Sequence, residues 1–120
     1  MKKLFLTAAL VVVLLLFPGR SVLAQDSFCM LYFTYIGCPN CAYTDPLVLD
    51  EWLEKYPNLV VVEYGWYGGD WNDPNSQFFG NYTEEYRLQA AVPQIVISED
   101  KNCLGRIDVL NAESYIQQLK

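Results

Sequence analysis

Apolar and polar residues follow one another along this chain in a way that predicts short strands separated by amphipathic helices. Residues 28–35 form a nearly continuous apolar run, which is typical of a strand covered on both faces. The β-branched run 59–64 predicts a second buried strand.

Between these two strands we expect one helix that starts at or just after Cys38 and ends at Pro57. Its apolar stripe follows helical spacing and consists of Leu49, Trp52, Leu53 and Tyr56. Pro46 lies inside this helix and is expected to kink it.

The second half of the chain predicts two more strands and two more helices. Residues 94–98 and 103–109 are the expected strands, and a short turn joins them. A helix is expected over 83–90, with Thr83 as its N-cap and two glutamates at its positive end. Asn111 is expected to cap a last helix with a similar apolar stripe.

The order of these elements predicts the fold class. A strand–helix–strand opening forces a parallel pair with a right-handed crossover. The late pair of strands, joined by a short turn, must be antiparallel. We therefore predict an α/β domain with three layers, in which helices cover both faces of a mixed central sheet of about four strands.

The stretch 65–82 is the least regular part of the chain, because glycine, aspartate, asparagine and proline interrupt it. It is dense in aromatic residues, namely Trp66, Tyr67, Trp71, Phe78, Phe79 and Tyr82. We interpret it as a loop or a broken helix. Its rings either cover the core of the sheet, which a small domain needs, or form an apolar surface for unfolded or partner protein.

The N-terminus has the layout of a secretory signal. A basic start precedes an apolar run that ends at Leu16, and a small residue, Ala24, lies before the expected cleavage point. We predict a signal peptide over 1–24 and one folded domain over 25–120. The protein is then secreted, periplasmic or held at the cell exterior. An uncleaved signal anchor is the alternative, although the run is shorter than the roughly 20 residues of a membrane span.

Charge restricts the partners. The 120-residue chain has a formal net charge of −6, and its first 24 residues hold three of the eight basic residues and none of the 14 acidic ones. Residues 25–120 therefore carry a net charge of −9. Such a domain repels nucleic acid and anionic membranes, so we expect neither as a partner, apart from a membrane reached through an uncleaved signal. We expect a monomer.

Cys38 and Cys41 carry the most distinctive chemistry. With Cys38 at the N-cap of the first helix, its sulfur meets unpaired backbone N–H groups at the positive end of the helix dipole, and both favour the thiolate. Pro39 suits the first helical position, where no N–H is needed, and Asn40 completes the loop. Cys41 lies one turn on and deeper. We predict that Cys38 attacks a substrate disulfide and that Cys41 resolves the mixed disulfide, without a cofactor.

Two alternatives remain for this pair. A zinc site needs four ligands, and the chain has no histidine and no second CxxC, so we expect no metal. A merely structural bridge would close a very short loop and restrain little. The alternative function is therefore a binding module whose CxxC holds a soft metal such as Cu(I) or serves only structure.

The residues around this motif resemble the thioredoxin superfamily, secreted thioredoxin-like proteins in particular. The strand MLYFTYIG leads into C-P-N-C, Pro46 follows Cys38 by eight residues, and V-P precedes a strand in YRLQAAVPQIVIS. The resemblance covers nearly all of residues 25–120. It implies a thioredoxin-like fold and an exported thiol–disulfide oxidoreductase. It also implies protein substrates with thiols or disulfides and a redox partner that recycles the pair, but it leaves open whether the protein oxidises, reduces or isomerises.

The resemblance also implies roles for residues outside the motif. Pro93 would be a cis-proline facing the disulfide, and the backbone of Val92 would pair with an extended substrate segment. From the residues alone, a trans proline at the start of a strand is the commoner arrangement. Many thioredoxins have a buried acid where this chain has Tyr32. Glu63 is a candidate proton acceptor for Cys41, unless it only ends a strand in water.

The two remaining cysteines predict a structural disulfide. If the third strand runs antiparallel beside the first, Cys103 lies near Cys29 at the start of the first strand. A bridge would close a loop of about 74 residues and stabilise the fold by about 4 kcal/mol. The alternative is two separate thiols that behave as small hydrophobic side chains. Export to an oxidising compartment favours the bridge.

Overall fold

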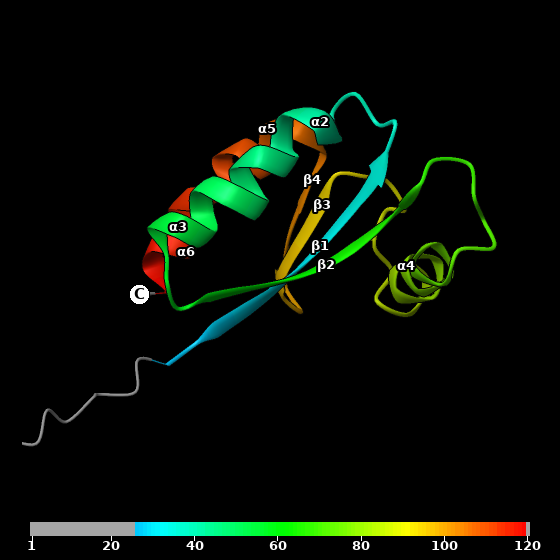
Figure 1. Cartoon of the computed structure of the whole chain (residues 1–120). Helices are drawn as coiled ribbons and strands as arrows, with labels where there is room; N and C mark the ends of the chain where they lie inside the picture. The colour runs from blue at the N-terminus through cyan, green and yellow to red at the C-terminus, as the bar shows by residue number, and fades with distance from the viewer. Residues whose placement is uncertain (1–25, 120) are drawn as a thin grey trace, which may run out of the picture.

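A four-stranded mixed sheet, in the order β2-β1-β3-β4, forms the middle of the molecule in the computed structural model, which describes residues 26–119 (Figure 1). The signal peptide predicted over 1–24 lies outside the described residues. The elements are β1 (Phe28–Ile36), α2 (Cys41–Pro46), the π-helical segment η1 (Leu47–Glu51), α3 (Trp52–Lys55), β2 (Leu59–Tyr67), α4 (Pro74–Glu85), β3 (Gln94–Ser98), β4 (Lys101–Leu104), α5 (Gly105–Asn111) and α6 (Glu113–Gln118).

Strand pairing follows the predicted scheme. β1 and β2 are parallel over their whole length. β3 runs antiparallel to β1, with Phe33 opposite Gln94, and β4 runs antiparallel to β3. The predicted fold class, a three-layer α/β/α domain with a mixed sheet, is confirmed, and the arrangement is compatible with a thioredoxin-like fold.

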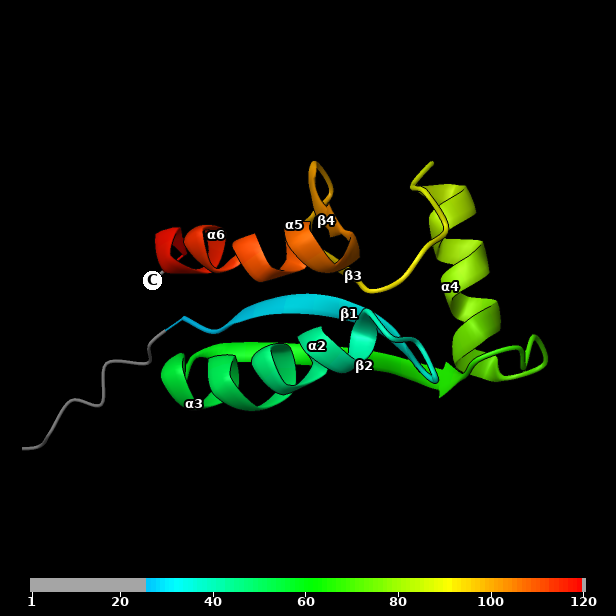
Figure 2. The ribbon, with the colours of Figure 1, turned by 90° about the horizontal axis from the view of Figure 1, so that it is seen from above.

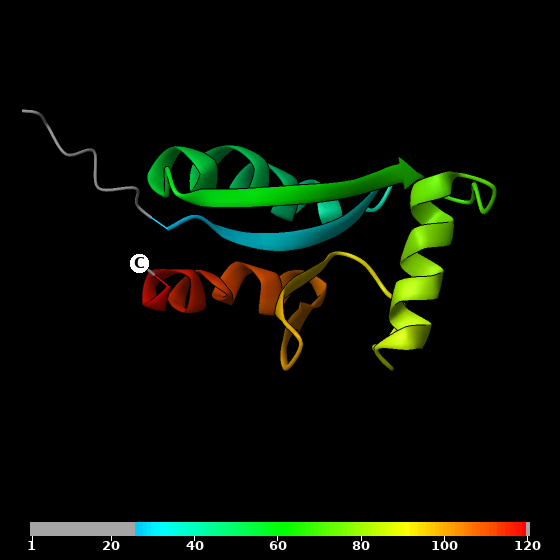
Figure 3. The ribbon, with the colours of Figure 1, turned by 90° about the horizontal axis from the view of Figure 1, so that it is seen from below.

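Helices cover the two faces of the sheet unequally. α2, η1 and α3 lie beside α5 and α6 along one face, which we call the α2 face, whereas α4 crosses the other face near the ends of β1 and β2 (Figures 2 and 3). Alternate side chains of a strand point to opposite faces. Met30 and Tyr32 therefore join the core of the α2 face, and Phe33 joins the core under α4, which we call the α4 face.

The first helix changes its hydrogen-bond pattern at Pro46. The helical backbone continues from Cys41 to Lys55, and the π-helical segment begins directly after Pro46, where a kink was expected. A proline has no N–H to donate to the carbonyl four residues earlier. The wider π turn follows the point at which that bond is missing, and the helix keeps its length.

The predicted helix over 83–90 is wrong, because α4 starts nine residues earlier, at Pro74. Asp73 is its N-cap, and the side chain of Asp73 accepts a hydrogen bond of 2.8 Å from the backbone N–H of Asn75. Thr83 lies in the last turn, where its hydroxyl donates to the Phe79 carbonyl at 2.9 Å. Asp followed by Pro is a helix-start signal that the irregular composition of this stretch concealed.

The last strand is shorter than predicted. β4 ends at Leu104, because Gly105 has a φ of +81° and turns the chain into α5. Glycine adopts this left-handed conformation without the steric conflict that a Cβ brings. The predicted last helix at Asn111 is therefore two short helices, α5 and α6, that follow the turn.

Candidate functional site

A tight turn carries the chain from the end of β1 to the start of α2. Gly37 has a φ of +98°, in the region that favours glycine. The backbone N–H of Cys38 then donates to the carbonyl of Tyr35 at 3.2 Å. The turn places Cys38 just beyond the C-terminal ends of the parallel strands β1 and β2.

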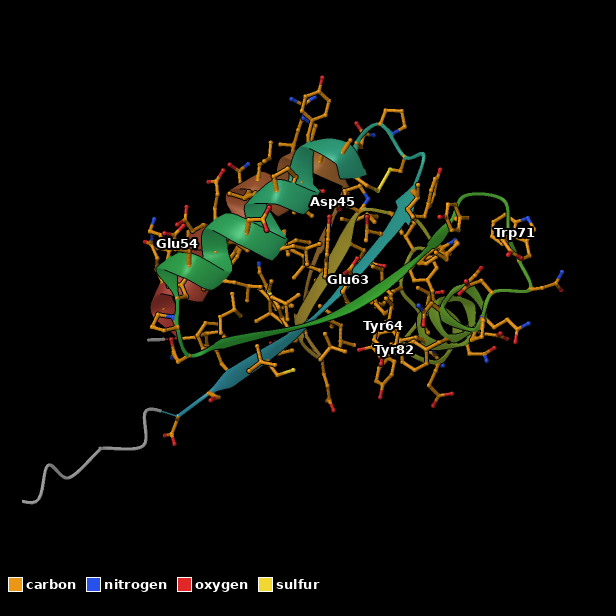
Figure 4. The ribbon with its side chains drawn as sticks, viewed as in Figure 1. Asp45, Glu54, Glu63, Tyr64, Trp71 and Tyr82 are labelled. Atoms are coloured by element: carbon orange, nitrogen blue, oxygen red, sulfur yellow. A yellow bond between two sulfur atoms is a disulfide. The ribbon has the colours of Figure 1, made fainter. Side chains whose placement is uncertain are left out.

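Cys38 and Cys41 form a disulfide, with their Cα atoms 5.2 Å apart (yellow bond in Figure 4). Cys38 keeps 7% of its surface exposed, whereas Cys41 is fully buried. Pro39 and Asn40, between them, are exposed. Of the two sulfur-bearing residues, only Cys38 is reached from solvent, which matches the order expected for an attacking and a resolving cysteine.

The sulfur of Cys38 lies at the start of a helical turn. The backbone N–H of Cys41 donates to Cys38 Sγ at 3.1 Å, and the N–H of Ala42 donates to the Cys38 carbonyl at 3.1 Å. The regular helix α2 begins at Cys41 and has Asn40 as its N-cap, so the predicted N-cap position of Cys38 is wrong by two residues. The sulfur nevertheless accepts a backbone N–H in the turn that leads into the helix. The sulfur therefore lies against one backbone N–H donor, just before the positive end of the helix.

A hydrogen-bonded polar group lies beneath the disulfide on the α2 face. Tyr32 donates from its hydroxyl to Asp45 Oδ1 at 2.6 Å, and Thr34 donates to the same oxygen at 2.8 Å. Thr44 Oγ1 lies 2.8 Å from the hydroxyl of Tyr32. Burial and the bond to Asp45 raise the pKa of Tyr32 well above its ordinary value, so Tyr32 is a donor and Asp45 the acceptor.

Sequence reasoning missed Asp45. The predicted proton acceptor, Glu63, is on a strand, whereas the Asp45 carboxylate comes from the helix, four residues after Cys41. Residues four apart share one face of a helix, and that spacing was the available signal. Glu63 lies on β2 in register with Tyr32, is exposed, and Tyr32 donates to Asp45 instead (Figure 4). Its predicted role as proton acceptor stays a prediction.

Val92 and Pro93 lie at the same end of the sheet as Cys38. Phe33 opposite Gln94 is the last pair of the β1–β3 ladder, and Pro93 comes directly before it. The Val92–Pro93 peptide bond is cis, the geometry that the resemblance implies. Pro93 is buried, and its carbonyl accepts a hydrogen bond of 2.8 Å from the N–H of Gly105.

Two hollows lie at this end of the sheet. One, of about 650 Å³, runs from Asn40 to the start of α5, where the guanidinium of Arg106 lies 3.6 Å from the ring of Tyr43. The other, of about 480 Å³, has mainly apolar walls that include Val92 and Trp71. Trp71 is 75% exposed and projects from the loop after β2 (Figure 4). An extended segment lying along Val92 would meet these apolar walls.

The predicted disulfide between Cys29 and Cys103 is wrong, because both thiols are free. Cys103 is paired with Ile95, which is paired with Tyr32, so it faces the α2 face. Cys29 is an odd number of residues from Tyr32 on the same strand and therefore faces the opposite way. Cys29 is exposed, whereas Cys103 is buried, and burial raises the pKa of its thiol.

Three further observations bear on the class of protein. Within residues 26–119, no group of three or more histidine, cysteine, aspartate or glutamate side chains lies close enough together to hold a metal ion. Over the same residues, every helix is too short or too polar to span a membrane. No family model, curated protein or solved structure matches the chain. What the protein does must therefore be inferred from its own residues.

Proposed function

We propose that this protein is an exported thiol–disulfide oxidoreductase that exchanges disulfides with the cysteines of other proteins through its C-P-N-C motif. The observation that carries the proposal is the disulfide at the helix start, in which Cys38 Sγ accepts the N–H of Cys41 and Cys41 is buried behind it. Export rests on the predicted signal over 1–24.

In the reducing direction, the Cys38 thiolate attacks one sulfur of a substrate disulfide. A mixed disulfide forms, and the other substrate sulfur leaves as a thiolate. Cys41 then loses its proton and attacks Cys38 Sγ, which releases the second substrate sulfur and forms the Cys38–Cys41 disulfide. The substrate gains two electrons and two protons. A dithiol partner must reduce the pair again, and in the oxidising direction every step runs backwards with a disulfide-bearing partner.

The backbone amides at the helix start determine how easily the Cys38 sulfur carries negative charge. Their dipoles and N–H groups stabilise a thiolate there. A stabilised thiolate is present at neutral pH as a nucleophile, and it is also a good leaving group when substrate thiols attack the disulfide. In the reduced protein we therefore expect a Cys38 thiolate that persists below the pH at which an ordinary thiol ionises.

The substrate segment is proposed to lie along Val92 and Pro93. The backbone of Val92 lies just before β3, at the end of the sheet where Cys38 also lies, and it can pair with an extended substrate segment. The apolar hollow beside Val92 favours substrate segments with apolar side chains next to the reacting cysteine.

A turnover assay on residues 25–120 tests the proposal. We expect the protein to reduce insulin disulfides with a dithiol donor, or to oxidise a reduced two-cysteine peptide, and we expect Cys38→Ser to fall to the background rate. Cys29→Ser is the matched control, because Cys29 is exposed but faces the opposite side of the sheet, and it should keep full activity.

Two results contradict the proposal. One is wild-type protein with no turnover in either direction whose reduced form binds Cu(I) stoichiometrically, which would favour the binding module. The other is equal turnover by wild type and Cys38→Ser.

A further inference from the structure

One carboxylate oxygen is held by two buried hydroxyls below the disulfide. Tyr32 and Thr34 both donate to Asp45 Oδ1, at 2.6 and 2.8 Å. The donors are 0% and 4% exposed and come from alternate positions of β1, the strand that leads to Cys38. Both bonds use Oδ1, so neither uses Oδ2. The strand therefore fixes the carboxylate in one orientation against the helix that carries the cysteines.

This carboxylate lies one helical turn from Cys41. Residues four apart on a helix are neighbours on one face. Thr44 connects the two groups further, because its hydroxyl oxygen lies 3.2 Å from the Cys41 carbonyl oxygen and 2.8 Å from the hydroxyl of Tyr32. Asp45 is half-buried, so it faces both the interior and solvent.

Cys41 needs a route for its proton. A thiol attacks a disulfide only as the thiolate, and burial in an apolar environment disfavours that charge. Cys41 has no exposed surface, so at neutral pH its proton passes more readily to a base held inside the protein than to bulk water. The neighbouring Tyr32 cannot serve as the base, because it is the donor in its bond to Asp45.

We propose that Asp45 takes the proton from the Cys41 thiol, directly or through one water, when Cys41 resolves the mixed disulfide; the inference rests on the proposed function. The S–H bond of Cys41 breaks, and the carboxylate becomes a carboxylic acid. The Cys41 thiolate attacks Cys38 Sγ, and the substrate sulfur leaves with the electron pair of the broken S–S bond. The proton on Asp45 then passes to the leaving thiolate or to water, which restores the carboxylate.

The other ionisable groups around Asp45 are less well placed. Glu63 on β2 is the register neighbour of Tyr32, but it is exposed. On α5, the guanidinium of Arg106 stacks on the ring of Tyr43. On α2 itself, Cys38 and Cys41 are the reacting groups. Asp45 is the acid that the buried hydroxyls of β1 hold in place, one helical turn from Cys41.

The test separates the two cysteines kinetically. Reduced protein carrying Cys29→Ser is mixed with an aromatic disulfide reagent whose thiolate is coloured. Attack by Cys38 releases one chromophoric thiolate, and resolution by Cys41 releases a second.

Asp45→Asn is expected to slow the second phase by roughly 100-fold near neutral pH and to leave the first within about twofold. Asparagine keeps an oxygen that can accept from Tyr32 and Thr34, so the fold should survive. Asp50→Asn, which removes an exposed carboxylate from η1, is the matched control and should leave both phases unchanged. Glu63→Gln tests the competing acid.

The pH profile distinguishes proton transfer from a structural role. As pH rises, hydroxide deprotonates Cys41 without help, so the deficit of Asp45→Asn should shrink steadily. A deficit of the same size at every pH, an unchanged second phase, or an equal loss in Glu63→Gln would overturn the inference. A wild-type protein that never shows a second phase would overturn the proposed function itself, and this outcome is distinct from the other three.

Discussion

The two faces of the sheet are built from different chemistry. On the α2 face, hydroxyls and a carboxylate are hydrogen-bonded to one another beneath the disulfide. On the α4 face, aromatic rings pack around Phe33, whose ring centroid lies 4.9 Å from that of Phe79 and 5.5 Å from that of Tyr64. Tyr64 on β2 and Tyr82 on α4 both lie on the α4 face of the sheet (Figure 4). The contrast indicates that one face supplies the chemistry and that the other mainly supplies apolar burial.

Phe33→Ala should produce the largest effect and should separate these roles. Phe33 is fully buried and at the centre of the ring cluster, so truncation removes its contacts and leaves a cavity. We expect a loss of about 3–5 kcal/mol in the free energy of unfolding. Urea denaturation followed by tryptophan fluorescence measures it. The fraction that stays folded should keep the two-phase thiol kinetics of the wild type, and a selective loss of the second phase would show that the faces are not separable.

A matched pair of threonines sharpens the comparison at the next level. Thr34 and Thr83 are 4% and 3% exposed, and the hydroxyl of each is a hydrogen-bond donor. Thr34 donates to a carboxylate, whereas the Thr83 hydroxyl is shared between two backbone carbonyls, those of Phe79 at 2.9 Å and Gly80 at 3.0 Å. We expect Thr34→Val to cost about 1.5–3 kcal/mol and Thr83→Val about 0.5–1.5 kcal/mol, because bonds to charged groups are stronger. Urea midpoints of the two variants measured side by side test this order, and equal losses would count against a charged acceptor at Asp45.

The sequence was informative where periodicity is regular and long. β1, β2 and the helix between them were predicted because buried strands and an amphipathic stripe leave clear patterns. The start of α4 was missed because Asp73 and Pro74 lie among glycines and aromatic residues that have no clear period. Asp45 was missed because only the folded chain brings it to Tyr32 and Thr34.

Strand order is the main reason why Cys103 does not pair with Cys29. β3 lies between β1 and β4, so Cys103 on β4 is two strands away from Cys29 on β1, which is too far for a disulfide. One irregularity in the sheet also puts the two side chains on opposite faces. The β3–β4 ladder shifts by one residue between Val96 and Ser98. With the pairing of Ser98 and Lys101 continued, Cys103 would lie opposite Val96, on the face to which Cys29 points. The bulge instead places it opposite Ile95, because a one-residue shift exchanges the faces of a strand. Sequence patterns do not reveal such a shift.

Alkaline pH should weaken the α2 face through Tyr32. Its pKa is raised in the folded protein above the ordinary value of 10.0, so the folded state holds this proton when the unfolded chain has released it. The stabilisation is complete below pH 10.0 and is lost as pH rises above it, by at most about 1.4 kcal/mol per pH unit. Tyr32→Phe should flatten this loss. Thermal melts at increasing pH measure it.

Cys103 must be controlled for in that experiment, because its raised pKa predicts a loss of the same sign that begins above pH 9.0. The comparison is therefore made in a Cys103→Ala background. Parallel alkaline curves with and without the Tyr32→Phe substitution in that background would contradict the burial of an ionisable hydroxyl on the α2 face.

The smallest expected effect is that of Cys29→Ser, and it discriminates strongly for that reason. Cys29 is exposed, and its thiol is free. Exposed substitutions of this kind change the free energy of unfolding by less than about 0.5 kcal/mol. A disulfide to Cys103 would instead make the same substitution cost about 4 kcal/mol, because it closes a long loop. Urea denaturation of the oxidised protein, with mass spectrometry of its non-reduced peptides, distinguishes the two. A loss near the larger value would mean that Cys103 lies beside Cys29 in solution, and hence that β3 does not separate β1 from β4 there.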